Sequence, residues 1–131
     1  MTPMLERIQS VSAIVLGCAF TWIGIQHFTD VEFFVPIVPA ILGNAEFWVY
    51  VSGVVEILLG LTMIAPATRA RAAQATAVFL VVVYWANLNM WVNDIAIGGQ
   101  TFSFAAHVLR AIAQLGLIGV ALFIARGRTA E

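Results

Sequence analysis

The sequence predicts an all-α integral membrane protein: a bundle of four transmembrane helices with an interfacial lid segment between the first and the second. Three observations predict this class. The 131 residues are 62% hydrophobic and 10% charged, with a mean hydropathy of +0.98, which lies far outside soluble composition. Four apolar runs approach the ~20 residues that cross ~30 Å of hydrocarbon. Five of the six arginines lie before the first run, between the second and third runs, or after the fourth run. We expect one membrane domain covering residues 1–131.

The four predicted spans cover residues 8–25, 47–65, 72–92 and 104–125. Pro66 is expected to end the second span, because proline cannot continue a helix. Thr68 and Ser103 are expected to cap the third and fourth spans, since a hydroxyl satisfies free backbone amides at a helix start. Gly98 and Gly99 favour a turn before the fourth span.

The connection between the first two spans, residues 30–42, is too apolar for a solvated loop. It is also too short for a span and contains Pro36 and Pro39. Such a segment is expected to lie in the membrane interface, as a lid across one end of the bundle.

The arginines predict the orientation of the chain. The connections at residues 29–46 and 93–103 contain no lysine or arginine. Because positive charge concentrates on the cytoplasmic side, both termini are expected in the cytoplasm of a bacterial-type inner (plasma) membrane. The arginines that carry this prediction are Arg7, Arg69, Arg71, Arg126 and Arg128.

Charge and cysteine content exclude two kinds of function. Six arginines, no lysine and seven acidic residues give a net charge of −1, without a basic cluster that could follow a phosphate backbone. Nucleic acid is therefore not an expected partner. Cys18 is the single cysteine, so the chain can form neither an internal disulfide nor a CxxC redox pair. Redox chemistry would have to come from a ligand or another protein.

Glu56 and Arg110 are the two charged residues inside the predicted spans, and we expect them to pair. A charge at the bilayer centre costs roughly 2.5–3.5 kcal/mol on insertion scales, so it needs a partner. At 1.5 Å per residue, Glu56 lies ~14 Å and Arg110 ~9 Å below the starts of their runs. An arginine side chain spans that difference.

Further polar residues lie in the halves of the spans that we expect to be outermost. Together with the two charges they predict an outward-facing pocket for a small ligand. The inner halves offer bulky apolar residues that would close the pocket, which favours a pocket over a pore. The expected ligand-binding residues are His27, Glu56, Tyr84, Asn87, His107, Arg110 and Gln114; the expected seal is formed by Leu58, Leu59, Leu61, Leu115, Leu117 and Ile118.

Several of these residues also have a purely structural interpretation. Glu56 and Arg110 would then clamp two helices together, and His27 would anchor its helix in the interface. Asn87 and Asn89 would join helices. A metal site is not expected, because Arg110 would place a cation beside the metal. The small residues Ala13, Gly17 and Thr21 would serve packing within the bundle or a homo-oligomer.

Several segments together resemble the DoxX-like family of small four-helix membrane proteins. The matching pieces are His27-Phe28, Pro39, Tyr50 to Gly60, Pro66 to Arg69, Ala86-Asn87 with Met90, and Leu109-Arg110 with Gln114. The resemblance covers residues 20–115. It departs at Trp85, and at Ala111 to Ala113, where the family commonly has prolines, so we expect straighter third and fourth helices. The resemblance implies a four-helix bundle and a link to redox physiology, because relatives include subunits associated with thiosulfate:quinone oxidoreduction.

Three functions remain open from the sequence. The first is an accessory protein of a membrane redox complex, with no catalytic residue of its own, that binds a small amphipathic molecule such as a quinone. The polar head would lie on Glu56 and Arg110, with His27 and His107 as proton partners. The second is a structural or assembly subunit whose Glu56–Arg110 pair only fixes helix packing. The third, a small transporter or channel, is least favoured by the apolar inner halves.

Overall fold

The structure, a computed structural model, describes residues 2–127; Arg128, which contributes to the predicted orientation, lies outside them. Within that range the chain is helical and contains four helices that are long and apolar enough to cross a membrane. These are α1 (Pro3–Thr29), α3 (Ala45–Ile64), α4 (Arg69–Val92) and α5 (Phe104–Ala125). The short turns α2 (Val31–Phe34), η1 (Val35–Ile37) and η2 (Ala40–Leu42) lie between α1 and α3. The predicted all-α class with four long apolar helices is confirmed.

The helix ends follow from local capping. α1 begins at Pro3, earlier than the predicted residue 8, because Thr2 Oγ1 accepts a hydrogen bond from the Leu5 amide at 3.3 Å. Ser103 caps α5 as predicted, accepting from the Ala106 amide at 3.2 Å. Thr68 occupies the cap position of α4, but its hydroxyl donates to the Thr62 carbonyl at 2.6 Å instead of accepting from α4. The predicted cap is therefore right in position and wrong in its bond.

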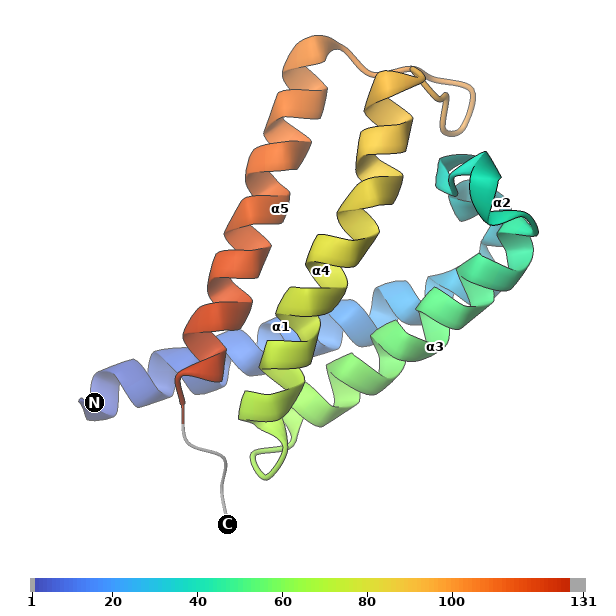
Figure 1. Ribbon diagram of the computed structural model, residues 1–131. Coiled ribbons are helices and arrows are strands. Elements are labelled where there is room, and N and C mark those ends of the chain that lie inside the picture. The colour runs from blue at the N-terminus through green and yellow to red at the C-terminus, as the bar shows by residue number, and fades with distance from the viewer. Residues whose placement is uncertain (1, 128–131) are drawn as a thin grey trace.

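The long helices form two antiparallel hairpins, α1 with α3 and α4 with α5 (Figure 1). The hairpins meet near the N-terminus and the α3–α4 turn and spread apart toward the end that carries α2. α4 and α5 each run without interruption, as the missing family prolines predict. The spread leaves one end of the molecule wider than the other.

Four glycines bring α1 and α3 into close contact. A Cβ added to Gly17 would lie 2.7 Å from the Gly60 carbonyl oxygen, and one added to Gly24 would lie 2.9 Å from the Gly53 oxygen. Both helices carry these glycines seven residues apart, so the close contact repeats after two turns. We call Gly17, Gly24, Gly53 and Gly60 the glycine seam. The small residues of α1 thus serve packing within the chain.

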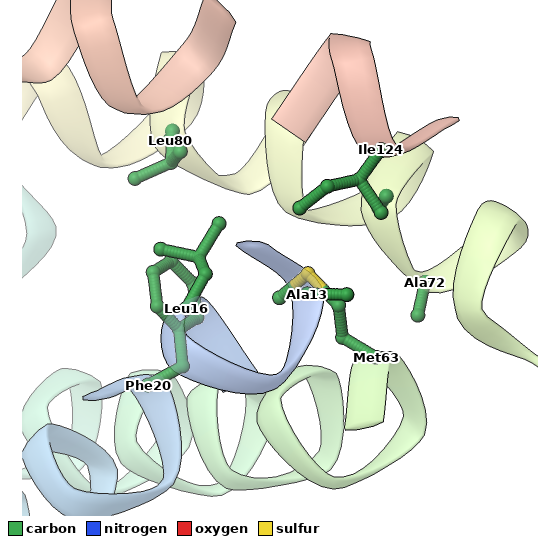
Figure 2. Packing of buried hydrophobic residues seen from close by; sticks show 8 residues of the cluster. Ala13, Leu16, Phe20, Met63, Ala72, Leu80 and Ile124 are labelled. Atoms are coloured by element: carbon green, nitrogen blue, oxygen red, sulfur yellow. The ribbon is translucent and has the colours of Figure 1, made fainter. Parts of the chain in front are cut away.

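The apolar core lies where the hairpins meet (Figure 2). It is formed by Ala13, Leu16, Phe20, Met63, Ala72, Ala73, Leu80 and Ile124, with Leu59 and Ile118 packed against it. The predicted seal is thus only partly right. Leu58, Leu61 and Leu115 are exposed, because they lie on the outer faces of helices whose inner faces already pack on the core. The interior is closed mainly by α1 and α4.

The lid segment folds as short helical turns over the wide end. The Phe34 ring stacks on the His27 ring with centroids 3.9 Å apart. Asn89 on α4 donates to the Ile37 carbonyl at 3.2 Å. The lid is therefore held to both hairpins, and Asn89 binds the lid rather than a neighbouring long helix.

Candidate functional site

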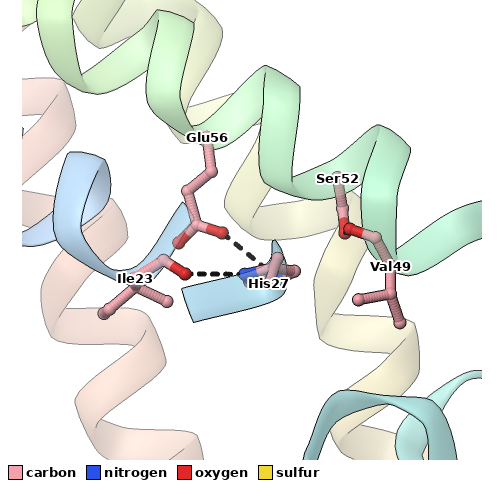
Figure 3. A network of polar contacts seen from close by, with 5 residues as sticks. All are labelled: Ile23, His27, Val49, Ser52 and Glu56. Carbon is pink, nitrogen blue, oxygen red and sulfur yellow. Dashed lines mark hydrogen bonds and ion pairs between the residues drawn. The ribbon is translucent and has the colours of Figure 1, made fainter. Parts of the chain in front are cut away.

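The centre of the site is a pair of buried ionisable residues, His27 near the end of α1 and Glu56 in the middle of α3 (Figure 3). His27 Nε2 lies 3.6 Å from Glu56 Oε2, and each residue is 8% exposed. His27 Nδ1 lies 2.8 Å from the Ile23 carbonyl oxygen. A carbonyl only accepts, so Nδ1 carries a hydrogen, and Nε2 faces Glu56 Oε2 at ion-pair distance.

The glycine seam positions this pair. A Cβ added to Gly53 would lie 2.6 Å from the His27 Cβ, so the absence of a side chain at Gly53 lets His27 approach α3. Glu56 follows Gly53 by three residues and therefore lies on the same face of α3. The close contact of the two helices thus places a histidine beside the carboxylate that needs a partner.

The predicted Glu56–Arg110 pair is wrong. Among residues 2–127 the single salt bridge joins Glu56 to His27. Arg110 instead donates from Nη2 to Asn87 Oδ1 at 2.7 Å. The physical reason is that α3 and α5 belong to different hairpins that spread apart, whereas α4 lies directly beside α5. The similar depths of Glu56 and Arg110 along their helices predicted their height in the bundle, but not which helices lie side by side.

A cavity of about 370 Å³ lies between the hairpins beneath the lid. His27 and Glu56 are in its wall, and so are Asn87 and Gln114 from the opposite hairpin. Four of the seven predicted ligand-binding residues therefore meet around one space. The rest of the lining is largely apolar and comprises Phe20, Ile23, Phe34, Ile37, Val38, Val49, Ser52, Phe79, Leu80, Val83, Ala86 and Leu117.

The other three predicted residues, Tyr84, His107 and Arg110, lie in a separate cluster between α4 and α5. The space between them is only about 10 Å³, roughly enough for one water. The His107 ring stacks on Trp91 at 5.4 Å, and its Nδ1 lies 3.4 Å from Arg110 Nη1. The predicted single pocket is therefore divided, and Asn87 is the residue that both spaces share.

His107 carries the one buried polar side-chain atom in residues 2–127 without a hydrogen-bond partner, which is Nε2. Because arginine only donates, the contact from Arg110 makes Nδ1 the acceptor and leaves the ring hydrogen on Nε2. An unpaired buried donor of this kind costs about 1–3 kcal/mol.

A wider hollow of about 660 Å³ lies at the narrow end, among residues that include Glu6, Arg69 and Arg126. The Arg69 guanidinium there already makes hydrogen bonds within the chain. It donates to the carbonyls of Met63 and Ile64 at 3.1 and 2.8 Å, and so ties down the end of α3. This hollow therefore has the character of a helix-end clamp.

Sequence reasoning missed three residues that shape the cavity. Ser52 precedes Glu56 by four residues and so shares its helix face, a spacing that could have identified it. Phe34 stacks on His27 from the lid, but the sequence carries no signal for a contact of this kind. Gly53 could have been found from the seven-residue spacing to Gly60 and the equal spacing of Gly17 and Gly24.

Comparisons with known proteins add one family. A family model described as "Domain of unknown function (DUF8561)" matches residues 16–125, which include about half of α1 and all the other long helices. No curated protein and no solved structure matches the chain. The match covers far more than half of the sequence. The chain therefore belongs to the DUF8561 family, whose description assigns no activity.

Proposed function

We propose that this chain is an integral membrane protein that binds a small amphipathic molecule, such as a quinone, in the cavity between its two hairpins. The observation that carries the proposal is the His27–Glu56 pair, which is buried in the wall of a mostly apolar cavity of about 370 Å³. Small-molecule sites commonly have volumes of about 300–1,000 Å³ and combine an apolar lining with a few polar groups.

The lining suits a ligand with a flat polar head and an apolar tail. Phe20, Phe34 and Phe79 offer aromatic surface, and Glu56 and Asn87 provide polar groups on facing hairpins. The lid contributes Ile37 and Val38 to the same space. A tail leaving the cavity past these residues would stay in apolar surroundings. The proposed ligand is therefore one that arrives from the lipid phase.

The proposal includes the orientation in the bilayer. Many large apolar side chains on the outer faces of the long helices are exposed, which suits contact with lipid. With both termini cytoplasmic, as the arginines predict, the lid and the cavity entrance would face the outer leaflet of a bacterial-type inner membrane.

A redox setting is part of the proposal and is supported by the resemblance to DoxX-like proteins. In this setting the chain would serve a membrane redox complex as an accessory subunit. His27 and Glu56 would act as proton partners of a quinone-like ligand. Chemistry on that ligand would be supplied by the partner complex.

A structural role is the second candidate, because the His27–Glu56 pair also joins α1 to α3 directly beside the glycine seam. In that case the pair would fix helix register without binding anything. A transport function is least supported, since apolar core residues such as Leu16 and Met63 occupy the region where the hairpins meet.

The test is to identify what copurifies with the protein. Lipid-soluble molecules would be extracted from the detergent-purified wild type and measured by mass spectrometry. Ala86→Phe places a ring in the cavity wall and should abolish copurification. Ala75→Phe is the matched control on the same helix, at an exposed position, and should retain the ligand.

We expect one amphipathic species in the wild type and in Ala75→Phe, at levels that exceed those in Ala86→Phe at least tenfold. Equal melting temperatures of the two variants would show that the difference is not due to unfolding. If the wild type yields only bulk lipids, or if the same species appears equally in all three, the binding proposal is wrong and the structural role takes its place.

A further inference from the structure

The polar atoms of the cavity differ between its two walls. On the α1–α3 side, the hydrogens are already committed. His27 Nδ1 donates to the Ile23 carbonyl, and His27 Nε2 faces Glu56 Oε2 at 3.6 Å. The other oxygen of the Glu56 carboxylate, Oε1, is left as an acceptor at a residue that lines the cavity.

Ser52 adds a second acceptor on the same wall. Its hydroxyl donates to the Val49 carbonyl at 3.0 Å, so the Oγ lone pairs remain available (Figure 3). Ser52 and Glu56 lie one turn apart on α3 and both line the cavity. The α1–α3 wall therefore accepts hydrogen bonds and offers no free donor.

The opposite wall provides amide groups. Arg110 donates to Asn87 Oδ1 at 2.7 Å, and since arginine cannot accept, this contact fixes the orientation of the Asn87 amide. The Asn87 nitrogen is thereby left as a donor at a residue that lines the cavity. Gln114 donates to the Leu80 carbonyl at 2.9 Å and retains its Oε1 and one N–H.

From this division we infer that the cavity selects a head group with a hydroxyl donor facing α3 and an oxygen acceptor facing α4, which describes a hydroquinone better than a quinone. The inference rests on the proposed function and names the form of the ligand. A hydroquinone hydroxyl donates to Glu56 Oε1, and its second oxygen accepts from Asn87. A quinone carries only acceptors, so it leaves the α3 wall unpaired.

The experiment compares three probes with the same decyl tail, binding to the full chain in detergent under anaerobic conditions. These are decylhydroquinone, its dimethyl ether and decylquinone. The ether keeps both oxygens and removes both donors. Calorimetric titration should give a Kd for the hydroquinone at least about tenfold below those of the ether and the quinone, because a buried acceptor left unpaired is costly.

Two variants test the residues that set this preference. Glu56→Met removes the acceptor and should bring the ether-to-hydroquinone ratio of Kd values close to one. Asn87→Asp retains an oxygen for Arg110 but replaces the donor by an acceptor, so the ether should lose affinity and the ratio should rise. Gln74→Glu, the same amide-to-carboxylate change at an exposed residue of α4, should leave the ratio unchanged. Ser52→Ala gives a smaller fall in the ratio should Glu56→Met fail to fold.

The outcomes separate the inference from the function on which it rests. If the ether or the quinone binds as tightly as the hydroquinone, the cavity binds amphipathic molecules without the proposed selection, and only the inference is overturned. If none of the three probes binds, the proposed function falls as well. A ratio that is unaffected by both Glu56→Met and Ser52→Ala would place the selection outside the α3 wall and refute the assignment.

Discussion

Replacing Gly60 by alanine should destabilise the protein by separating α1 from α3. The added Cβ would lie 2.6 Å from the Gly17 carbonyl oxygen and 2.7 Å from the Thr21 amide nitrogen. Ordinary contact begins at 3.4 Å, so the two backbones must move apart by about 0.8 Å, the difference between 3.4 and 2.6 Å. A gap of 0.5–1 Å forfeits roughly a quarter to a half of each dispersion contact.

The Thr21 hydroxyl is closer still and could rotate away, but the other two neighbours are backbone atoms, so rotation of a side chain cannot relieve the clash. We therefore expect the free energy of unfolding to fall by about 1–3 kcal/mol, the usual cost of overpacking. The measurement is equilibrium unfolding of the purified protein in mixed micelles. Gly116→Ala is the matched control, because a Cβ there meets nothing within 4 Å. It should be neutral, or stabilising by up to about 1 kcal/mol through helix propensity.

The double variant Gly17→Ala with Gly60→Ala sharpens the test. Both glycines lie at the same contact, so once the helices have separated the second methyl should cost less than the first. Equal stabilities for Gly60→Ala and Gly116→Ala would refute the reasoning. So would strict additivity of the Gly17 and Gly60 losses.

Three further predictions concern the site and the orientation. Glu56→Met and His27→Phe should each lower the free energy of unfolding by more than half of the loss in the double variant, since each single variant leaves one buried partner unpaired. Unfolding measurements of the two single variants and the double variant test this, and additive losses would contradict the pairing. His107→Phe should keep its stacking and remove an unpaired donor; it also removes the long Arg110 contact, but Arg110 keeps its bond to Asn87, so the melting temperature should not fall. A membrane-impermeant thiol reagent on intact cells, with Cys18 replaced by Ala, should label cysteine at Gln100 and not at Thr2; the reverse pattern would invert the orientation.

Much of the fold could be predicted from the sequence, because each long helix contains an apolar run that is long enough to cross a membrane. The lid was also predictable, since residues 30–42 combine apolar character with two prolines. The start of α1 could not be predicted, because the helix extends beyond the apolar run, through residues 3–7, to a cap at Thr2. Helix ends depend on single hydrogen bonds, and hydropathy does not record them.

The candidate site was predictable in its residue types and only partly in its contacts. Counting residues along helices placed Glu56 and Arg110 at similar depths, but depth does not say which helices touch. The glycine seam decides which helices touch, since it joins α1 to α3 and so places His27 beside Glu56. Arg110 instead pairs with Asn87 on α4, the helix beside its own.

The arrangement of the hairpins makes the width of the cavity sensitive to the angle between them. α1 and α3 are locked together by the glycine seam, whereas the two hairpins join at the turn after Ile64, where Arg69 binds the end of α3. α4 has 24 residues and is therefore ~36 Å long. A rotation of about 5° at that turn moves its far end by ~3 Å, close to the thickness of an aromatic ring. The room for a flat molecule beneath the lid therefore depends on how firmly the core and the Asn89 contact hold that angle.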